Sequence, residues 1–189
     1  DDNNRCTWSM RSLLITYNNG CQILVDSGCG EKQSEKFFSH YDLHGDASLK
    51  SSLDDLNLHY SEIDHHIITH FHFDHVGGST VNTSKGIQLA FENATYWTHS
   101  RQWEEANNPN SREKASFLPE NIQPIAASGS LKFLDTNSFF DEYSIRFLYT
   151  SGHTSYQAIP IIKFKGKTYA FVADLIPSIG HIPLPYVMA

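Results

Sequence analysis

The sequence predicts a layered α/β domain, with β-strands towards both ends of the chain and helices between them. Three observations predict it: a hairpin pattern over 12–26, apolar residues at helical spacing over 31–43, and a strand-rich segment over 144–173. The chain has 189 residues, 40% of them hydrophobic and 13% aromatic, so it can bury the core of one domain. Because no repeat and no interdomain linker interrupts it, we expect residues 1–189 to form a single domain.

The first half of the chain is expected to alternate strands and helices. Strands over 12–17 and 21–26 flank an Asn-Asn-Gly sequence, which favours a tight turn. The aromatic residues Phe37, Phe38 and Tyr41 lie on one face of a helix predicted over 31–43. The other elements expected here are a short helix that Ser52 caps and that runs through 54–56, a buried strand over 65–69, a strand over 94–98 and a helix that Ser100 caps.

The second half is expected to be richer in strands. The segment 107–121 is polar and contains Pro109 and Pro119, which predicts a long surface loop. Together with the helix before it, this loop makes residues 99–121 a lid-like insertion. The strands that follow are expected over 131–134, 144–150, 157–164 and 168–173.

Composition argues against several kinds of partner. Fourteen Lys and Arg against 21 Asp and Glu give a net charge of −7 without a dense basic run, which argues against nucleic acid. No apolar stretch approaches the roughly 18 residues of a membrane-spanning helix, so no membrane partner is expected. Three cysteines without a CxxC spacing argue against a disulfide framework. We therefore expect a small-molecule substrate, and we consider a homodimer as the oligomeric state.

Both ends of the sequence look like cuts through a longer chain. It begins Asp-Asp-Asn-Asn, without an initiator Met or a charged-then-apolar signal segment, and it closes on an apolar run over 182–189. We expect a cytoplasmic protein, with any targeting segment lying outside this sequence.

Four potential metal ligands lie within six residues, directly after the predicted strand over 65–69. In extended backbone alternate side chains share a face, so His70 and His72 can point at one ion. A turn at Asp74 and His75 would direct these two side chains towards a second ion. Imidazole and carboxylate suit zinc, manganese or iron, and the lack of nearby cysteine argues against a closed structural zinc site. A lone histidine is more often a solvated or structural residue, but this spacing favours metal binding.

This His-x-His-x-Asp-His pattern resembles the hallmark of the metallo-β-lactamase superfamily. Further segments occur in the order of that family. Residues 24–28 resemble its early strand and turn, 151–154 resemble its Gly-His-Thr segment, and Asp174 ends an apolar strand where the family places a bridging aspartate. The resemblance implies a four-layer αββα sandwich that is incomplete at both termini.

The resemblance also implies a site for two divalent metal ions, foremost Zn²⁺, with Mn²⁺ or Fe²⁺ as alternatives. The ligands that it implies are His70, His72 and His153 for the first ion, and Asp74, His75 and Asp174 for the second, with Asp174 bridging both. The family's last histidine ligand would lie beyond residue 189. His181 is its one substitute here, and we interpret it as a pocket or structural residue. Asp26 is expected to orient a ligand imidazole, or alternatively to cap the turn that follows it. We expect the first ion to bind better than the second.

Aspartate rather than cysteine at position 174 favours the broad hydrolase branch over the zinc β-lactamases that use a cysteine ligand. The segments 103–119 and 174–186 resemble quorum-quenching lactonases. The resemblance implies that a hydroxide activated by two metals opens a lactone or other ester-type bond, such as an acyl-homoserine lactone. Asp74 would then move the proton to the leaving alkoxide. Pro177 stands where such lactonases have a tyrosine, so the group that stabilises the oxyanion is unassigned.

Several alternatives remain open at this stage. The same metal pair would serve a thioester hydrolase of the glyoxalase II type or a phosphotriester hydrolase. A mononuclear iron sulfur dioxygenase would leave Asp74 and His75 without a role, and a non-catalytic metal-binding member is the alternative outside enzymes. Phe73 and Trp103 are candidates for an apolar wall of the substrate site, or for ordinary core packing, which we favour for Phe71.

Overall fold

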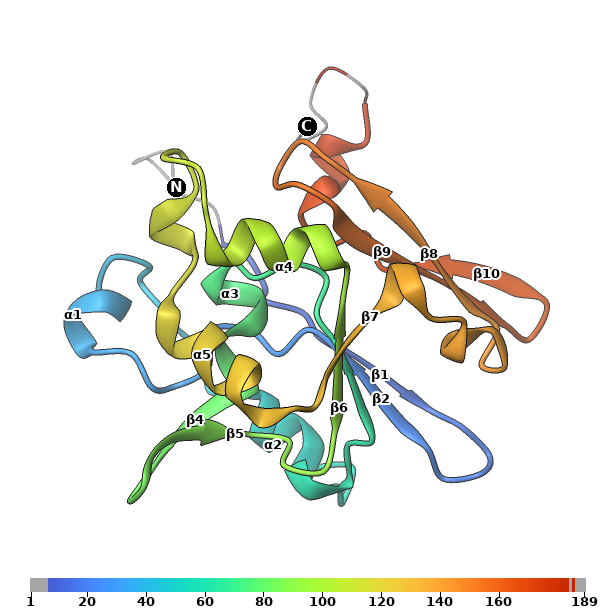
Figure 1. Ribbon diagram of the computed structural model, residues 1–189, viewed down its shortest axis with the longest axis horizontal. Helices are drawn as coiled ribbons and strands as arrows, with labels where there is room; N and C mark the ends of the chain where they lie inside the picture. The colour runs from blue at the N-terminus through green and yellow to red at the C-terminus, as the bar shows by residue number, and fades with distance from the viewer. Residues whose placement is uncertain (1–6, 184, 186–189) are drawn as a thin grey trace.

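The computed structural model, which describes residues 7–183 and 185, contains two β-sheets packed face to face (Figure 1). The larger sheet has the strand order β1-β2-β3-β6-β7. β1 pairs antiparallel with β2, and the other three pairs are parallel. Its strands are β1 (Leu13–Thr16), β2 (Gln22–Val25), β3 (His65–Ile67), β6 (Thr95–Thr98) and β7 (Leu131–Phe133).

The second sheet is antiparallel, in the order β10-β9-β8. It consists of β8 (Ile145–Thr150), β9 (Gln157–Phe164) and β10 (Lys167–Ala170). A separate hairpin, β4 (Thr80–Thr83) and β5 (Gly86–Leu89), lies on the helical side of the large sheet, against helix α5 (Pro119–Ser128) (Figure 1). The strand predicted over 157–164 is confirmed, because β9 has these bounds.

Within the described residues, five α-helices and several single 3-10 turns lie between the strands or after the last of them. The helices are α1 (Glu35–Phe38), α2 (Leu49–Asp54), α3 (Phe73–Val76), α4 (Ser100–Asn107) and α5 (Pro119–Ser128). The 3-10 turns are Tyr60–Glu62, Gly77–Ser79, Lys114–Ser116, Leu134–Thr136, Phe139–Asp141, Ala173–Leu175 and Ile179–His181. None of the helices in the described residues is both long and apolar enough to cross a membrane.

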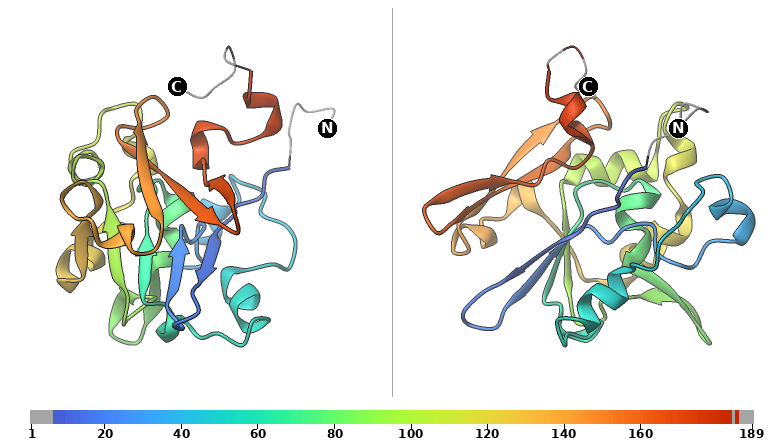
Figure 2. Two further views of the ribbon diagram at one scale, coloured as in Figure 1. Left: turned by 90° about the vertical axis from the view of Figure 1, so that its right-hand side faces the viewer. Right: turned by 180° about the vertical axis from the view of Figure 1, so that it is seen from behind.

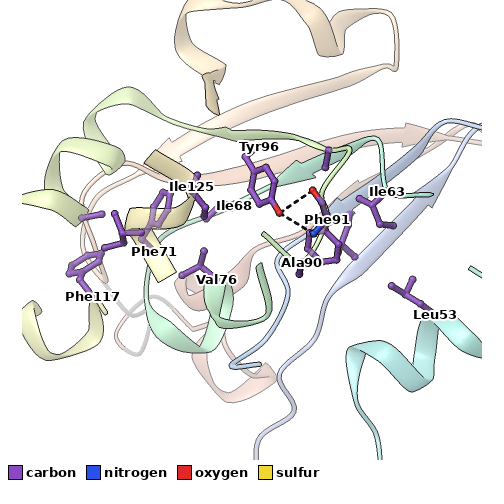
Figure 3. Close-up of a cluster of buried hydrophobic side chains, with 14 residues drawn as sticks. Leu53, Ile63, Ile68, Phe71, Val76, Ala90, Phe91, Tyr96, Phe117 and Ile125 are labelled. Carbon is purple, nitrogen blue, oxygen red and sulfur yellow. Dashed lines mark hydrogen bonds between the residues drawn. The ribbon is translucent and has the colours of Figure 1, made fainter. Parts of the chain in front are cut away.

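Alternating side chains of the large sheet supply two separate hydrophobic clusters. Leu24 faces a cluster formed with the helices, which Figure 3 shows around Tyr96 and Phe91. Ile23 and Val25 face the opposite way, into a cluster shared with strands β8 and β9. Because successive residues of a strand point to opposite faces, each buried strand contributes to both clusters. The result is a helical layer, a mixed sheet and an antiparallel sheet (Figure 2), which are three of the four layers expected.

The helix predicted over 31–43 is wrong in extent, because α1 covers only Glu35–Phe38. Ser34 caps its start by accepting a hydrogen bond from the Phe37 backbone N–H. No residue of this helix is buried. Phe37 packs instead on Tyr41 and Phe73, so the aromatic residues form a local cluster rather than the buried face of a long helix.

The loop predicted over 107–121 is also wrong in extent. Helix α5 begins at Pro119, the first helical position, where the missing N–H of proline costs nothing. Ile122 and Ile125 of this helix are buried in the cluster under the large sheet. That packing outweighs the unfavourable Pro124 inside the helix. The irregular segment is therefore shorter, and it runs between the end of α4 and Leu118.

Candidate metal centre

The candidate site begins where β3 ends. Thr69 is buried at this point, and its backbone N–H donates to Asp26 Oδ1 at 2.8 Å. Its carbonyl accepts from the Ala158 N–H of β9 at 2.9 Å. The residue before His70 is thus fixed between the two sheets. From there the backbone stays extended through His72 and then turns into α3, which carries Asp74 and His75.

Three histidines form the first candidate group of ligands. His70, His72 and His153 each offer a ring nitrogen, and these atoms lie within 4.8 Å of one another. His72 Nδ1 lies 3.0 Å from His153 Nε2, although the two residues are 81 positions apart. Burial lowers the pKa of His70 well below its usual value and that of His72 to about 4. These rings are therefore neutral at pH 7, which is the form that binds metal ions.

A second candidate group shares His70 with the first and adds His75 and Asp174. Asp174 Oδ1 lies 3.1 Å from His75 Nε2, and its other oxygen lies 3.3 Å from His153 Nε2. One carboxylate thus stands between the two groups. Although burial alone raises the pKa of Asp174, the hydrogen bond and the charge of His75 lower it. This position suits a bridging ligand.

Asp74 lies beside the second group rather than within it. Its Oδ2 is 3.8 Å from His75 Nε2, and its side chain lines the cavity above the histidines. Burial raises the pKa of its carboxyl. The structure therefore places Asp74 next to the other predicted ligands, at a position open to solvent.

Asp26 binds the nitrogen of the His75 ring that faces away from Asp174. Its Oδ2 accepts hydrogen bonds from His75 Nδ1 and from the Thr69 hydroxyl, both at 2.8 Å. Although burial alone lowers the pKa of His75, the carboxylates of Asp26, Asp174 and Asp74 raise it well above its usual value. With Nδ1 bound to Asp26, the ring directs Nε2 towards Asp174. The orienting role expected of Asp26 agrees with this geometry.

The residues present fit a divalent cation. His70 Nε2 is buried and has no hydrogen-bond partner in the described residues. The neutral imidazoles of His72 and His153 contact its ring, and the Asp174 carboxylate lies 3.3 Å from the second of them. A buried polar nitrogen without a partner is costly, and a cation would remove that cost. Imidazole and carboxylate together suit zinc, manganese or iron.

A cavity of about 470 Å³ opens over the two groups. Phe73 lies in its wall and is supported by Phe37 and Tyr41. Phe71 is fully buried and packs against Trp103 at 5.3 Å, in the cluster under the large sheet. Of the three aromatic candidates, only Phe73 therefore lies at the cavity. The lining residues are His72, Phe73, Asp74, Arg112, Glu113, Ser116, Gly152, His153 and Asp174.

His181 belongs to neither group of ligands that the described residues form. Its Nδ1 lies 2.8 Å from Ser178 Oγ, and its ring contacts Trp8 edge-on. These contacts are those of a structural residue.

Two residues of the cavity wall escape sequence reasoning. Arg112 and Glu113 come from the polar segment between α4 and α5, which contains no recognisable motif. Glu113 is buried, and its Oε2 lies 3.5 Å from His72 Nε2. Although burial alone raises its pKa, hydrogen bonds from Arg112, Asn110 and Thr154 hold the pKa at about 2. These two residues can be recognised as part of the cavity wall only because the structure shows this segment passing over the site.

Two glycines after His75 allow the metal-binding turn to pack against the loop that follows β2. A Cβ at Gly77 would lie 2.1 Å from the Cys29 carbonyl oxygen, and one at Gly78 would lie 2.2 Å from that of Ser27. These distances are too short for any side chain. The Gly78 N–H also donates to the Gly28 carbonyl at 3.0 Å.

Comparison with known proteins provides a second line of evidence beside this geometry. Residues 11–188 match the family model of the metallo-beta-lactamase superfamily. A probable metal-dependent hydrolase from Staphylococcus aureus has 26% identity and a TM-score of 0.74 over 85% of this chain and 56% of its own. AidC, a dizinc quorum-quenching lactonase solved with its product, has 23% identity and a TM-score of 0.67, covering 86% and 55%. The hydrolase AbOPH has 22% identity and a TM-score of 0.64, covering 87% and 55%.

The chain spans little more than half the length of these solved structures. A search of curated protein sequences finds no match.

Proposed function

Because the chain belongs to the metallo-β-lactamase superfamily, we propose that it acts as a metal-dependent hydrolase on a lactone or another ester-type bond. One observation carries the proposal. The two groups of ligands share His70 and have Asp174 between them, and their members His72, His153 and Asp174 line a cavity of about 470 Å³. The lactonases among the similar structures support the substrate class.

Under this proposal His70, His72 and His153 hold a first ion, and His75, Asp174 and Asp74 hold a second. We propose Zn²⁺ as the ion, with Mn²⁺ and Fe²⁺ as alternatives. Bound divalent ions supply Lewis acidity, which polarises a carbonyl oxygen and makes water acidic enough to react near neutral pH. The chain itself keeps the rings of His70, His72 and His153 neutral by burial. Contacts with Asp26 and Asp174 fix the directions of the His75 and His153 rings.

The remaining chemistry falls to two residues of the cavity wall. Asp74 reaches solvent there, and its raised pKa suits a group that takes a proton from water and passes it to the departing oxygen. Arg112 is the one permanent cation among the described residues that line the cavity. Its guanidinium can donate to a substrate oxygen that becomes negative, which is the role left open by Pro177.

Metal content by mass spectrometry, measured before and after a His72→Ala change, tests the proposal. We expect about two ions per chain in the unchanged protein and a sharp loss in the variant. About one iron ion would favour the dioxygenase alternative instead. No bound metal would overturn the hydrolase proposal.

A substrate panel then separates the alternatives that share this site. Acyl-homoserine lactones, simple esters, glutathione thioesters and phosphotriesters are compared with the metal-loaded protein and with its Asp74→Asn variant. We expect lactones or esters to be hydrolysed fastest, and the variant to lose 100-fold or more, on the order of a missing acid–base group. Faster thioester or phosphotriester hydrolysis would reassign the substrate class, and no hydrolysis of any substrate by a metal-loaded protein would favour a binding role.

A further inference from the structure

The carboxylate of Glu113 has two faces with different partners. Oε1 accepts hydrogen bonds from Arg112 at 2.8 Å and from the Asn110 amide at 3.0 Å, both within the segment between α4 and α5. Oε2 points the other way, to His72 Nε2 at 3.5 Å. Neither Oε2 nor this Nε2 has a partner at normal hydrogen-bond distance within the described part of the chain, although the Thr154 side chain lies near enough to the carboxylate to lower its pKa. The side chain of Glu113 is only 7% exposed, so water does not readily replace the missing partner.

The two nitrogens of His72 therefore face different surroundings. Nδ1 lies within the first group of ligands, 3.0 Å from His153 Nε2, whereas Nε2 faces Glu113. A neutral imidazole carries one proton, on one of its nitrogens. A proton on Nε2 satisfies the buried carboxylate and leaves the lone pair of Nδ1 directed at the ligand group. The opposite tautomer would point a lone pair at Glu113 and an N–H at the space for the cation.

We propose that Glu113 is a positioning residue, which selects the His72 tautomer with Nε2 protonated and so presents Nδ1 to the first cation. The proposal rests on the proposed metal-binding function. It assigns to the segment between α4 and α5 a role in assembling the metal centre, beyond covering it.

The segment between α4 and α5 also contacts the backbone next to the third histidine of the first group, His153. Arg112, which donates to Glu113, also donates to the carbonyls of Gly152 and His153, at 3.0 and 3.3 Å. The segment thus touches two of the three histidines of the first group. An ion that fixes these rings would stabilise the segment in this position, and the segment held there would strengthen binding of the ion by the same factor.

Three variants separate positioning from packing. In Glu113→Gln the amide oxygen is expected to stay with the two donors at the Oε1 position, so the NH2 group faces His72 Nε2 and donates to it, while Glu113→Leu keeps most of the volume and loses the acceptor. Arg112→Leu removes a partner of Oε1 and the bonds to the 152–153 carbonyls, but leaves Oε2 in place. Far-ultraviolet circular dichroism and urea unfolding confirm that each variant is folded.

The first readout is the tautomer of His72 in the metal-free protein, from long-range ¹H–¹⁵N NMR of labelled histidine. We expect Nε2–H in the unchanged protein and in Arg112→Leu, a shift towards Nδ1–H in Glu113→Gln, and a mixture of tautomers in Glu113→Leu. An unchanged Nε2–H signal in Glu113→Leu would overturn the proposal. Because no metal is present, this result does not depend on the proposed function.

The second readout is the affinity for the first Zn²⁺, measured by competition with a chromophoric chelator. Glu113→Leu and Glu113→Gln are both expected to weaken it about 10- to 100-fold, the usual effect of losing a group that orients a metal ligand. Hydrogen exchange of residues 108–118 should slow on addition of Zn²⁺ in the unchanged protein and respond less in Glu113→Leu. Equal affinities in all variants would contradict the proposal. No Zn²⁺ binding in the unchanged protein would instead contradict the proposed function.

Discussion

Buried polar side chains outside the ligand groups define the site at the level of single residues. Asp26 binds His75 from one side, and Glu113 faces His72 from another. Each carboxylate contacts the ring nitrogen that points away from the space for a cation. His66, four residues before the ligand motif, is fully buried as well, and it bonds to the Leu24 carbonyl and to Ser79. These contacts yield predictions for single substitutions.

Asp26→Asn is expected to destabilise the fold and to weaken the second metal group. An asparagine keeps one acceptor, but its amide cannot accept the hydrogen bonds of His75 and Thr69. Removing one partner of such a buried pair costs about 3 kcal/mol of unfolding free energy. Urea unfolding measures this loss, and chelator competition should show the second ion weakened about 10- to 100-fold.

Asp54→Asn is the matched control for that change. This carboxylate is exposed and pairs with Lys50 within α2, so its replacement should cost less than about 0.5 kcal/mol. Equal losses for the two variants would show that burial of Asp26 contributes nothing.

Stability should fall in mild acid partly because of His66. Its neutral ring donates from Nδ1 to the Leu24 carbonyl and accepts at Nε2 from Ser79, and burial lowers its pKa to about 4. Between pH 6.5 and 4 the unfolded chain therefore takes up a proton that the folded protein refuses, and folding weakens as pH falls. At pH 5 the loss of unfolding free energy amounts to about 2 kcal/mol, because each pH unit below the usual histidine pKa contributes about 1.4 kcal/mol.

Urea unfolding at pH 7.5 and pH 5 measures this effect. His66→Asn should be less stable than the unchanged protein at pH 7.5 but should lose about 2 kcal/mol less on acidification. His44→Asn, at an exposed histidine, should lose as much as the unchanged protein. Parallel pH profiles for His66→Asn and the unchanged protein would remove His66 as a cause.

Among the elements, α3 shows most clearly how a short helix depends on its neighbour. It has only four residues, too few to be stable alone. The chain just after it, at Gly77 and Gly78, packs against the backbone of 27–29 with no room for a side chain. Its position, and with it that of Asp74 and His75, is thus set by contact between two loops.

Gly77→Ala is expected to lose about 3 kcal/mol of stability or more, because its Cβ would overlap the Cys29 carbonyl and the loops must separate. Gly129→Ala is the control. Gly129 ends α5 with φ of 72° and has open space around it, so alanine there costs only about 1 kcal/mol. Urea unfolding compares the two variants, and a similar loss in both would argue against the tight packing at Gly77.

The accuracy of prediction also differs between elements for physical reasons. β9 was predictable to the residue because an apolar run ends at a Lys-Gly-Lys turn. Strand β6 differs from its prediction by one residue. The local sequence over 31–43 suggests a long helix, but no face of it is buried, and only one turn forms. α5 exists despite two prolines because its isoleucines are buried under the sheet.

At the scale of the whole molecule, the candidate metal centre joins the two sheets. His70, His72 and His75 follow β3 of the larger sheet, whereas His153 follows β8 and Asp174 follows β10 of the smaller one. The sheets otherwise meet through the hydrophobic cluster between them. An ion bound by residues from both would act as a cross-link between the layers.

Zinc is therefore expected to stabilise the whole fold. At a free concentration of 100 times its Kd, a ligand of the folded state adds about 2.7 kcal/mol of unfolding free energy. Thermal unfolding with Zn²⁺ and then with excess chelator measures the gain and its reversal, and hydrogen exchange should slow in both sheets. His153→Ala should lose most of this gain, and protection confined to the larger sheet would contradict the cross-link.

The oligomeric state remains a prediction, for which sedimentation is the test.

The sequence by itself determined the layered α/β class and the four candidate ligands within 70–75, because both follow from local order, whereas His153 and Asp174 were assigned through the resemblance to a family. The spacing of His70, His72, Asp74 and His75 after a buried strand needs no knowledge of distant contacts. Only the tertiary structure decided which residues surround them. Glu113 and Arg112 reach the cavity, and Trp103 does not, because packing of α4 and α5 on the sheet sets the path of the segment between them. Such contacts join residues tens of positions apart, and no local pattern encodes them.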